Sequence, residues 1–147
     1  MKFLVKEIRS KAGELHFRRW ALFDNAWFGV YLHHILKADE DIHPHNHPWS
    51  FVAIILKGGY REGLITIGGW FNKISGRTCE NKPCRLLYRN KDYYHKIHQL
   101  YGPTWTLVFR GPRRDNWGYL VLDKDDIPHH INHQTYRENK RNGHYTK

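Results

Sequence analysis

Three histidines alternate with other residues in the segment 41–49, and this spacing is typical of a metal site. His43, His45 and His47 occupy every second position of the segment. Side chains two residues apart on an extended backbone point to the same side, so His45 and His47 can converge on one ion. Neutral imidazole is a ligand that suits Fe, Zn, Cu and Ni. The segment therefore predicts part of a metal site, against the alternative of solvated histidines in a chain that contains twelve.

A third ligand must come from another part of the chain, and His95 is the best candidate. It lies at the start of a candidate strand, 94–99, in which Ile97 continues its face and His98 lies on the opposite face. Two histidines from one segment and one from a distant strand can hold a single ion and leave coordination positions open.

The segments around these histidines are predicted to be short β-strands. Aromatic residues make up 15% of the chain, and together with β-branched residues they dominate the apolar runs, which favours strands over helices. Turns that contain glycine or proline separate the runs, and we expect them at Ala12-Gly13, Gly58-Gly59, Gly68-Gly69, Gly76, Gly102-Pro103 and Gly111-Pro112. The candidate strands are 2–9, 14–22, 26–36, 48–57, 61–67, 68–73, 84–89, 94–99, 104–110 and 115–122. Many short strands at near-even spacing predict an all-β sandwich or closed barrel.

The length of 147 residues fits one domain of ordinary size. We expect residues 1–122 to form a single β-barrel domain. Residues 123–147 differ from the rest, because they are polar, carry four histidines and end in a stretch rich in lysine and arginine. We treat them as a C-terminal tail that can wrap the barrel, form a short helix or fray.

The histidine segment and the strand after it resemble the first motif of the cupin superfamily. That motif is HxH, a carboxylate a few residues later and a strand closed by glycine; HNHPW at 45–49 and the strand that ends at Gly58-Gly59 resemble it. Residues 92–95 resemble the shorter second motif, whose histidine is the last ligand. Over residues 14–122 the chain is also similar to small bacterial and phage cupin-like proteins. The resemblance implies a cupin-type double-stranded β-helix, or jelly-roll, barrel that holds one divalent ion on the three histidines.

The chain departs from the cupin pattern at the carboxylate, because Phe51 and Val52 stand where the family's glutamate is expected. What remains resembles the three-histidine variant found in thiol dioxygenases, which leaves the ion with its full double charge. The resemblance implies an Fe(II)-dependent oxygenase that acts on a small anionic or thiol substrate. Zn, Ni and Mn are the other candidate ions, and an isomerase or a lyase is the other candidate enzyme. The alternative is a non-catalytic, degenerate cupin that binds a small ligand, a partner or nucleic acid.

Further residues are candidates for the substrate site. Arg110 lies at the end of a candidate strand, where it can hold a substrate carboxylate or phosphate; a solvated arginine beside a turn is the alternative. Tyr94 can donate its phenol to a bound oxygen species or pack in the core. The predicted pocket walls are Trp49, Phe51, His33 and Trp105.

The formal charge of +10 favours anionic partners, of which nucleic acid is one. No strand face, however, presents the interleaved aromatic residues of a base-stacking platform. We therefore expect a small-molecule substrate, and the cupin resemblance implies a homodimer. No segment predicts a signal peptide or a membrane span, which favours a cytoplasmic protein with Cys79 and Cys84 reduced.

Overall fold

The computed structural model describes residues 5–10, 12–68, 73–114 and 117–145. Strand β9 (Thr104–Arg110) shows how the sequence forms the barrel. Thr104, Thr106, Val108 and Arg110 are buried, and the residues between them are partly exposed. Successive side chains of a strand point to opposite faces. The alternation therefore gives β9 one face toward the barrel interior and one face away from it.

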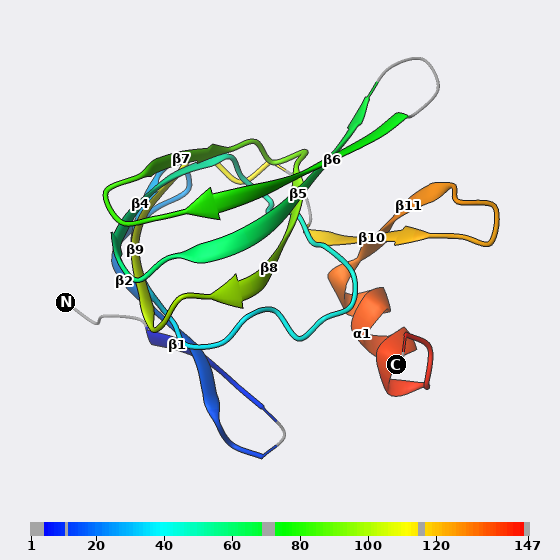
Figure 1. Cartoon of the computed structure of the whole chain (residues 1–147), viewed down its shortest axis with the longest axis horizontal. Helices are drawn as coiled ribbons and strands as arrows, with labels where there is room; N and C mark the ends of the chain where they lie inside the picture. Colours follow the sequence, from blue (N-terminus) through cyan, green and yellow to red (C-terminus); the bar gives the residue numbers. More distant parts are fainter. Residues whose placement is uncertain (1–4, 11, 69–72, 115–116, 146–147) are drawn as a thin grey trace.

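Six antiparallel strands form the larger sheet (Figure 1). In spatial order they are β1 (Val5–Arg9), β2 (Leu15–Asp24), β3 (Gly29–Ile35), β9, β4 (Phe51–Lys57) and β7 (Leu86–Arg89). Strand β9 lies between β3 and β4 and pairs with both of them along its length. Side chains from three distant parts of the sequence thus share one inner face.

The remaining strands form a second layer. Strands β6 (Lys73–Asn81), β5 (Tyr60–Gly68) and β8 (Tyr94–Leu100) pair in this order, and β10 (Gly118–Leu122) pairs with β11 (Pro128–Asn132). His45 makes single bridges to His95 in β8 and to Tyr119 in β10. The segment that carries His45 therefore lies between the two small sheets and joins them.

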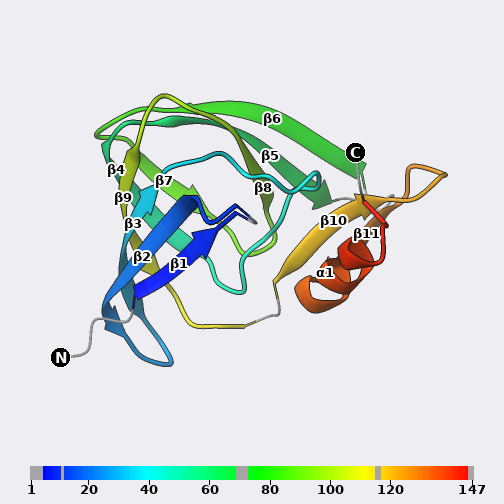
Figure 2. The same cartoon turned by 90° about the horizontal axis from the view of Figure 1, so that it is seen from below.

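Apolar side chains of both layers meet in one core. Ile55 of β4 is fully buried, and Ala53 beside it is 2% exposed. The core cluster consists of Tyr31, Ile35, Ala53, Ile55, Tyr60, Leu87, Ile97 and Val108. Figure 2 shows the strands curving around a common interior, which confirms the expectation of an all-β, cupin-type barrel.

Gly58 and Gly59 form the turn that takes the chain from β4 into β5. Their φ angles of 80° and 138° lie in the region that favours glycine. A Cβ at Gly58 would lie 2.6 Å from the carbonyl oxygen of Pro103. The turn predicted at these two glycines is confirmed, and it fixes how the two layers connect.

The C-terminal segment has a defined structure. Strand β11 pairs with β10, and helix α1 (His133–Arg141) follows directly. The side chain of Asn132 caps the helix by accepting a hydrogen bond from the Gln134 amide at 2.9 Å. Tyr136 is 1% exposed and stacks on Tyr119 of β10. Residues that the sequence analysis set apart as a tail thus extend the second layer. Within the described residues, no helix has the length and apolar character needed to cross a membrane.

Two predicted features of the middle of the chain differ from the structure. The sequence predicted a strand at 68–73 and a turn at Gly76; residues 69–72 lie outside the described residues, and Gly76 lies inside β6, opposite Ile65. The turn at Gly76 was therefore wrong. Strand β6 was missed because it is an exposed edge strand whose sequence has no apolar alternation. Cys79, in the same strand, and Cys84 are free thiols.

Candidate metal centre

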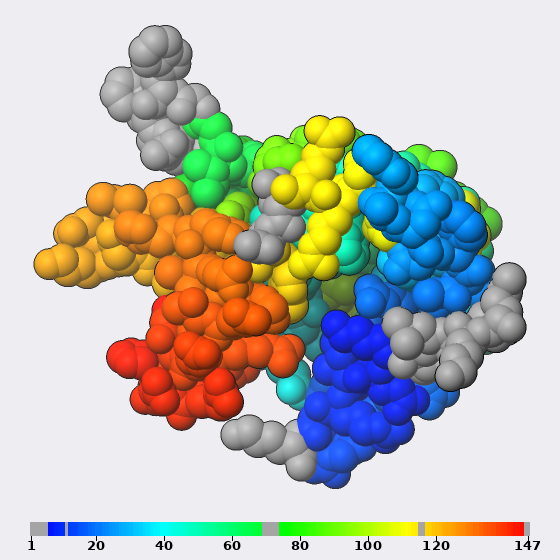
Figure 3. Space-filling model, turned by 180° about the vertical axis from the view of Figure 1, so that it is seen from behind, coloured from blue at the N-terminus to red at the C-terminus, as the bar shows by residue number. Residues whose placement is uncertain are grey.

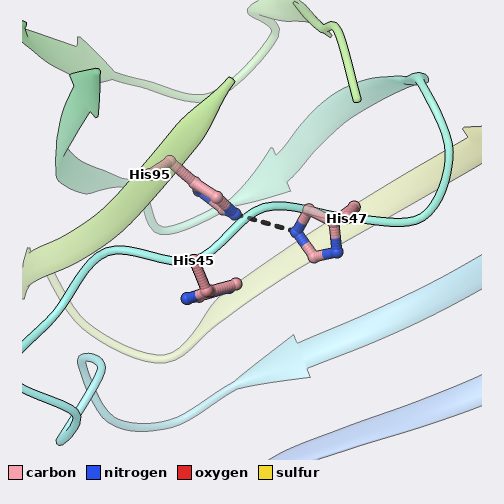
Figure 4. Close-up of side chains that lie close together, drawn as sticks. All are labelled: His45, His47 and His95. Atoms are coloured by element: carbon pink, nitrogen blue, oxygen red, sulfur yellow. Dashed lines mark hydrogen bonds between the residues drawn. The ribbon is translucent and has the colours of Figure 1, made fainter. Parts of the chain in front are cut away.

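The structure brings His45, His47 and His95 together (Figure 4). One nitrogen from each ring lies within 4.8 Å of the other two. The Nε2 atoms of His47 and His95 face each other at 2.8 Å. Two nitrogens bound to one ion at about 2.1 Å and at right angles would lie about 3 Å apart. The donor set and its spacing therefore fit a single divalent ion.

The backbone fixes where the rings of His45 and His95 lie. The two residues exchange a pair of amide–carbonyl hydrogen bonds of 2.9 and 2.8 Å, so they face each other across the joined sheets. Asn46 points to the other side, where its side chain accepts from the Gly118 amide at 2.8 Å and donates to the Lys91 carbonyl at 3.2 Å. This anchoring keeps the HxH segment extended, which leaves the two flanking histidines on one side.

Glu62 determines which ring nitrogen of His95 carries the proton. Its Oε1 lies 2.7 Å from His95 Nδ1, so the carboxylate accepts the proton of that nitrogen. With the Nδ1 proton held in this way, Nε2, the atom that faces His47, is the nitrogen available to a metal ion. A carboxylate behind a metal-bound histidine orients the ring and makes it a stronger ligand.

The Glu62 carboxylate is held in turn by a buried network. Asn81 Nδ2 donates to Glu62 Oε2 at 2.9 Å, and Arg89 donates to both carboxylate oxygens. Glu62 is 1% exposed. Burial alone would raise its pKa, but the hydrogen bonds and charges of His95 and Arg89 outweigh burial and lower the pKa to about 2. Glu62 therefore stays ionised at neutral pH.

Burial keeps the two histidines of the HxH segment neutral. Loss of hydration, followed by the charge of His95, lowers the pKa of His45 to about 4. The same causes, in the same order, hold the pKa of His47 well below its usual value. Neutral imidazoles at pH 7 present lone pairs, as metal ligands must.

Three of the predicted pocket residues lie next to the cluster. The ring of His47 contacts Phe51 edge-on at 5.2 Å between centroids and lies 6.4 Å from Trp49. His33 is stacked with Tyr31 at 6.1 Å between ring centroids, and its Nε2 is buried with no hydrogen-bond partner among the described residues. Aromatic and imidazole rings thus wall the side of the cluster that faces the larger sheet.

Two predicted site residues lie elsewhere. Trp105 is on the outer face of β9, where it stacks on His34 and Trp20, because its neighbours Thr104 and Thr106 take the inner positions. Tyr94 precedes His95 and points to the other side of β8, where its hydroxyl lies 2.8 Å from His130 Nδ1. Neither side chain faces the histidine cluster, and this corrects the prediction that they line the site.

Arg110 points into the barrel, as the inner-face position of its strand requires. Its guanidinium lies 5.4 Å from the ring centroid of Trp49 and donates to Tyr31 Oη at 3.2 Å. It also forms an ion pair with Asp24 and donates to the Asn25 carbonyl. Arg110 therefore reaches the pocket wall with its charge already matched by a carboxylate.

Sequence reasoning missed Glu62, although the sequence contains a signal for it. Tyr60, Glu62 and Leu64 share the buried face of β5. A carboxylate at a buried position of a strand needs buried partners. The partners could not be named from the sequence, because Asn81 and Arg89 come from two other strands whose pairing only the fold reveals.

The comparisons agree with the fold. No family model and no curated protein matches the sequence. Among solved structures, Fe(II) HppE matches with a TM-score of 0.56 at 8% identity, over 74% of this chain and 56% of that chain. The chain thus spans a little over half of HppE. A cupin-2 domain protein of Rhodospirillum rubrum, Rru_A2000, has a TM-score of 0.54 at 12% identity, over 84% of this chain and 78% of its own.

The polyketide cyclase RemF of Streptomyces resistomycificus gives a TM-score of 0.53 at 18% identity, over 76% of this chain and 75% of that chain. Identities this low establish the fold alone. The chain therefore has the cupin fold, as its motifs predicted. Its site is a cluster of three histidines placed as in a metal centre.

Proposed function

We propose that this chain is a mononuclear metal-binding cupin, an Fe(II)-dependent oxygenase that acts on a small anionic or thiol substrate. The convergence of His45, His47 and His95, with Glu62 holding the ring of His95, is the observation that carries this proposal. The metal set has no carboxylate ligand, so the ion keeps its double charge and attracts an anion or a thiolate. When bound, the ion would supply Lewis acidity and, as iron, redox chemistry with O₂.

Iron is favoured over zinc, nickel and manganese by the match to HppE, whose structure was solved with Fe(II). That match concerns the fold, so the choice of metal is part of the proposal. Three neutral nitrogen ligands suit Fe(II) and leave positions free for a substrate and a second small molecule. Phe51 and Trp49 lie against His47, and they would exclude water from the reacting side.

Metal content tests the ligand assignment. The full chain is loaded anaerobically with Fe(II), and bound metal is measured by mass spectrometry after desalting. We expect about one ion per chain in the wild type and a large loss in His47→Ala and in His95→Ala. The matched control is His98→Ala, because His98 is an exposed histidine of the same strand as His95 and should keep full occupancy. Full metal occupancy in both ligand variants would contradict the assignment of His47 and His95 as metal ligands.

Oxygen uptake tests the reaction. The iron-loaded protein is offered thiols and small carboxylic acids in an oxygen electrode, with His47→Ala as the background. Uptake that depends on both substrate and His47 supports an oxygenase. Full iron binding without turnover over the whole panel would instead support the second function expected from the sequence, a cupin that binds a small ligand without catalysis.

A further inference from the structure

Four basic side chains lie near one another where strands β1 and β2 approach helix α1, and we call them the cationic rim: Lys6, Arg19, Arg113 and Arg137. Figure 3 shows the surface hollowed on this face, between strands β1 and β2 in blue and the C-terminal segment in orange and red. Among the described residues, none of the four forms an ion pair with a carboxylate, whereas Arg18, the neighbour of Arg19 in β2, is paired with Glu7. Within the described part of the chain, the rim is thus a set of positive charges without carboxylate partners, beside the hollow.

Arg19 is the rim residue closest to the interior. It pairs with His33 across β2 and β3, and it therefore shares the inner face with Tyr31 and His33. Its guanidinium carbon lies 4.7 Å from the ring centroid of Tyr31. Stacking on an aromatic ring leaves the N–H groups at the edge of a guanidinium free to bind an oxyanion.

The other rim residues lie near Arg19 or near one another. Lys6 faces Arg19 across β1 and β2, so both side chains lie on one side of the sheet. After burial, the charges of Arg19 and Arg137 lower the pKa of Lys6. His133, at the start of α1, has its pKa lowered by burial and then by Arg137, Lys6 and Arg113. Lys6, Arg113 and Arg137 therefore lie close enough to His133 for their positive charges to act on it.

Two chains of rings connect the rim with the metal centre. On one side, Arg19 stacks on Tyr31, whose ring lies 6.5 Å from Trp49, the neighbour of His47. Two aromatic rings, those of Tyr31 and Trp49, therefore separate Arg19 from His47.

On the other side, His133 stacks on Trp117 at 4.4 Å between centroids, and Trp117 lies 6.3 Å from His45. Packed rings thus link both the N-terminal strands and the C-terminal segment to the histidines.

We propose that the cationic rim binds an oxyanion group of the small-molecule substrate, a carboxylate or a phosphoryl group, and that Arg19 is the positioning residue that holds it beside the metal centre. This inference rests on the proposed function for the identity of the reacting site. It assigns anion binding to Arg19 and not to Arg110, because Asp24 already neutralises Arg110. An oxyanion would be the missing partner of Arg19.

The test titrates the full chain, loaded with diamagnetic Zn²⁺, with inorganic phosphate, malonate and the neutral analogue malonamide. Binding is followed by ¹H–¹⁵N NMR, including the Nε–Hε signals of the arginines. Arg19→Gln should raise the Kd of the preferred anion about tenfold or more, and Arg19→Lys, which keeps the charge but loses the stacked guanidinium, should give a Kd between those of the wild type and Arg19→Gln. Arg18→Gln is the matched control, since Arg18 is the neighbouring residue, points to the other side of β2 and is paired with Glu7. Comparison of phosphate with malonate tells which oxyanion the rim prefers.

The outcomes separate this inference from the proposed function. Anion binding that persists in metal-free His95→Ala protein and is lost in Arg19→Gln supports the rim even where the metal assignment fails. An unchanged Kd in a folded Arg19→Gln protein, or equal binding of malonamide, overturns the inference. An equal loss in Arg18→Gln overturns it as well, because binding would then depend on total charge. Tighter, steeply salt-dependent binding of a single-stranded oligonucleotide than of either small anion would overturn it in favour of a nucleic-acid surface.

Discussion

The charges behind the metal centre and the charges in front of it are organised in opposite ways. Behind His95, Glu62 and Arg89 are both buried and are matched to each other by hydrogen bonds. In front, the cationic rim presents positive groups without carboxylate partners among the described residues. A buried charge must be paired within the protein, because its hydration has been lost. A charge at a hydrated surface can remain without a protein partner, and it is then available to bind an anionic ligand.

The two regions are therefore expected to have different functions, the rear network in holding His95 and the rim in binding a ligand. The rear network is paired with itself, so it cannot bind a ligand without breaking, and its effect is to fix the ring of His95. Our proposal for the rim implies little effect on folding and a direct effect on which ligand enters the site. Substitutions in the two regions should therefore change different quantities, stability and metal affinity at the rear and ligand affinity at the front.

The largest effect is expected for Arg89→Met. The substitution leaves the carboxylate of Glu62 buried without its cation, and we expect a loss of about 3–5 kcal/mol in the free energy of unfolding. Urea denaturation of the metal-free protein measures this loss. Arg85→Met is the control, because Arg85 lies in the same region at an exposed position. Equal stability of the two variants would contradict the view that the rear network is a paired, buried unit.

An intermediate effect is expected for Glu62→Gln. The neutral amide accepts the hydrogen bond of His95 more weakly than the carboxylate does, so the ring is less firmly oriented and is a weaker ligand. Metal affinity should therefore fall about 10–100-fold. Competition with a metal-binding dye gives the affinity. Glu80→Gln changes an exposed glutamate and should leave affinity unchanged. Should the two variants bind metal equally well, Glu62 does not support the site.

The smallest effect is expected at the rim. Replacing Arg113 and Arg137 by glutamine removes exposed charges that lie near other positive charges, so the free energy of unfolding should change by no more than about 0.5 kcal/mol. The same urea titration measures this change, at low and at high salt. Stability that falls by several kcal/mol would show that the rim is paired in solution, and the contrast between the two regions would disappear.

The sequence predicted the elements that depend on local alternation. The HxH spacing predicted which side chains share a face, and the inner residues of β9 follow from period-two burial. His95 was predicted as the third ligand from its place at the start of a strand and from the cupin resemblance. Its pairing with His45 was not predicted, since spacing alone does not pair segments that are 50 residues apart. Resemblance also predicted the barrel.

The parts that failed depend on pairing between strands. Trp105 was assigned to the pocket because tryptophan is usually buried, but the inner face of β9 belongs to its neighbours. Arg110 was predicted to bind an anion, and only the fold shows that Asp24 lies beside it. Arg19 is in a strand that the sequence predicted, yet its role depends on having no carboxylate across β1 or β3, which no local pattern reveals.

His45 is both a candidate metal ligand and part of the backbone that joins the two small sheets. Its amide and carbonyl groups pair with His95, and its segment joins β8 to β10. Separation of the two small sheets would therefore pull apart two of the three rings, and a bound cation would oppose that local opening. Amide hydrogen exchange at His45 and His95 should then slow when the ion binds. Release of the metal and local unfolding of the His45 segment between β8 and β10 would be one event.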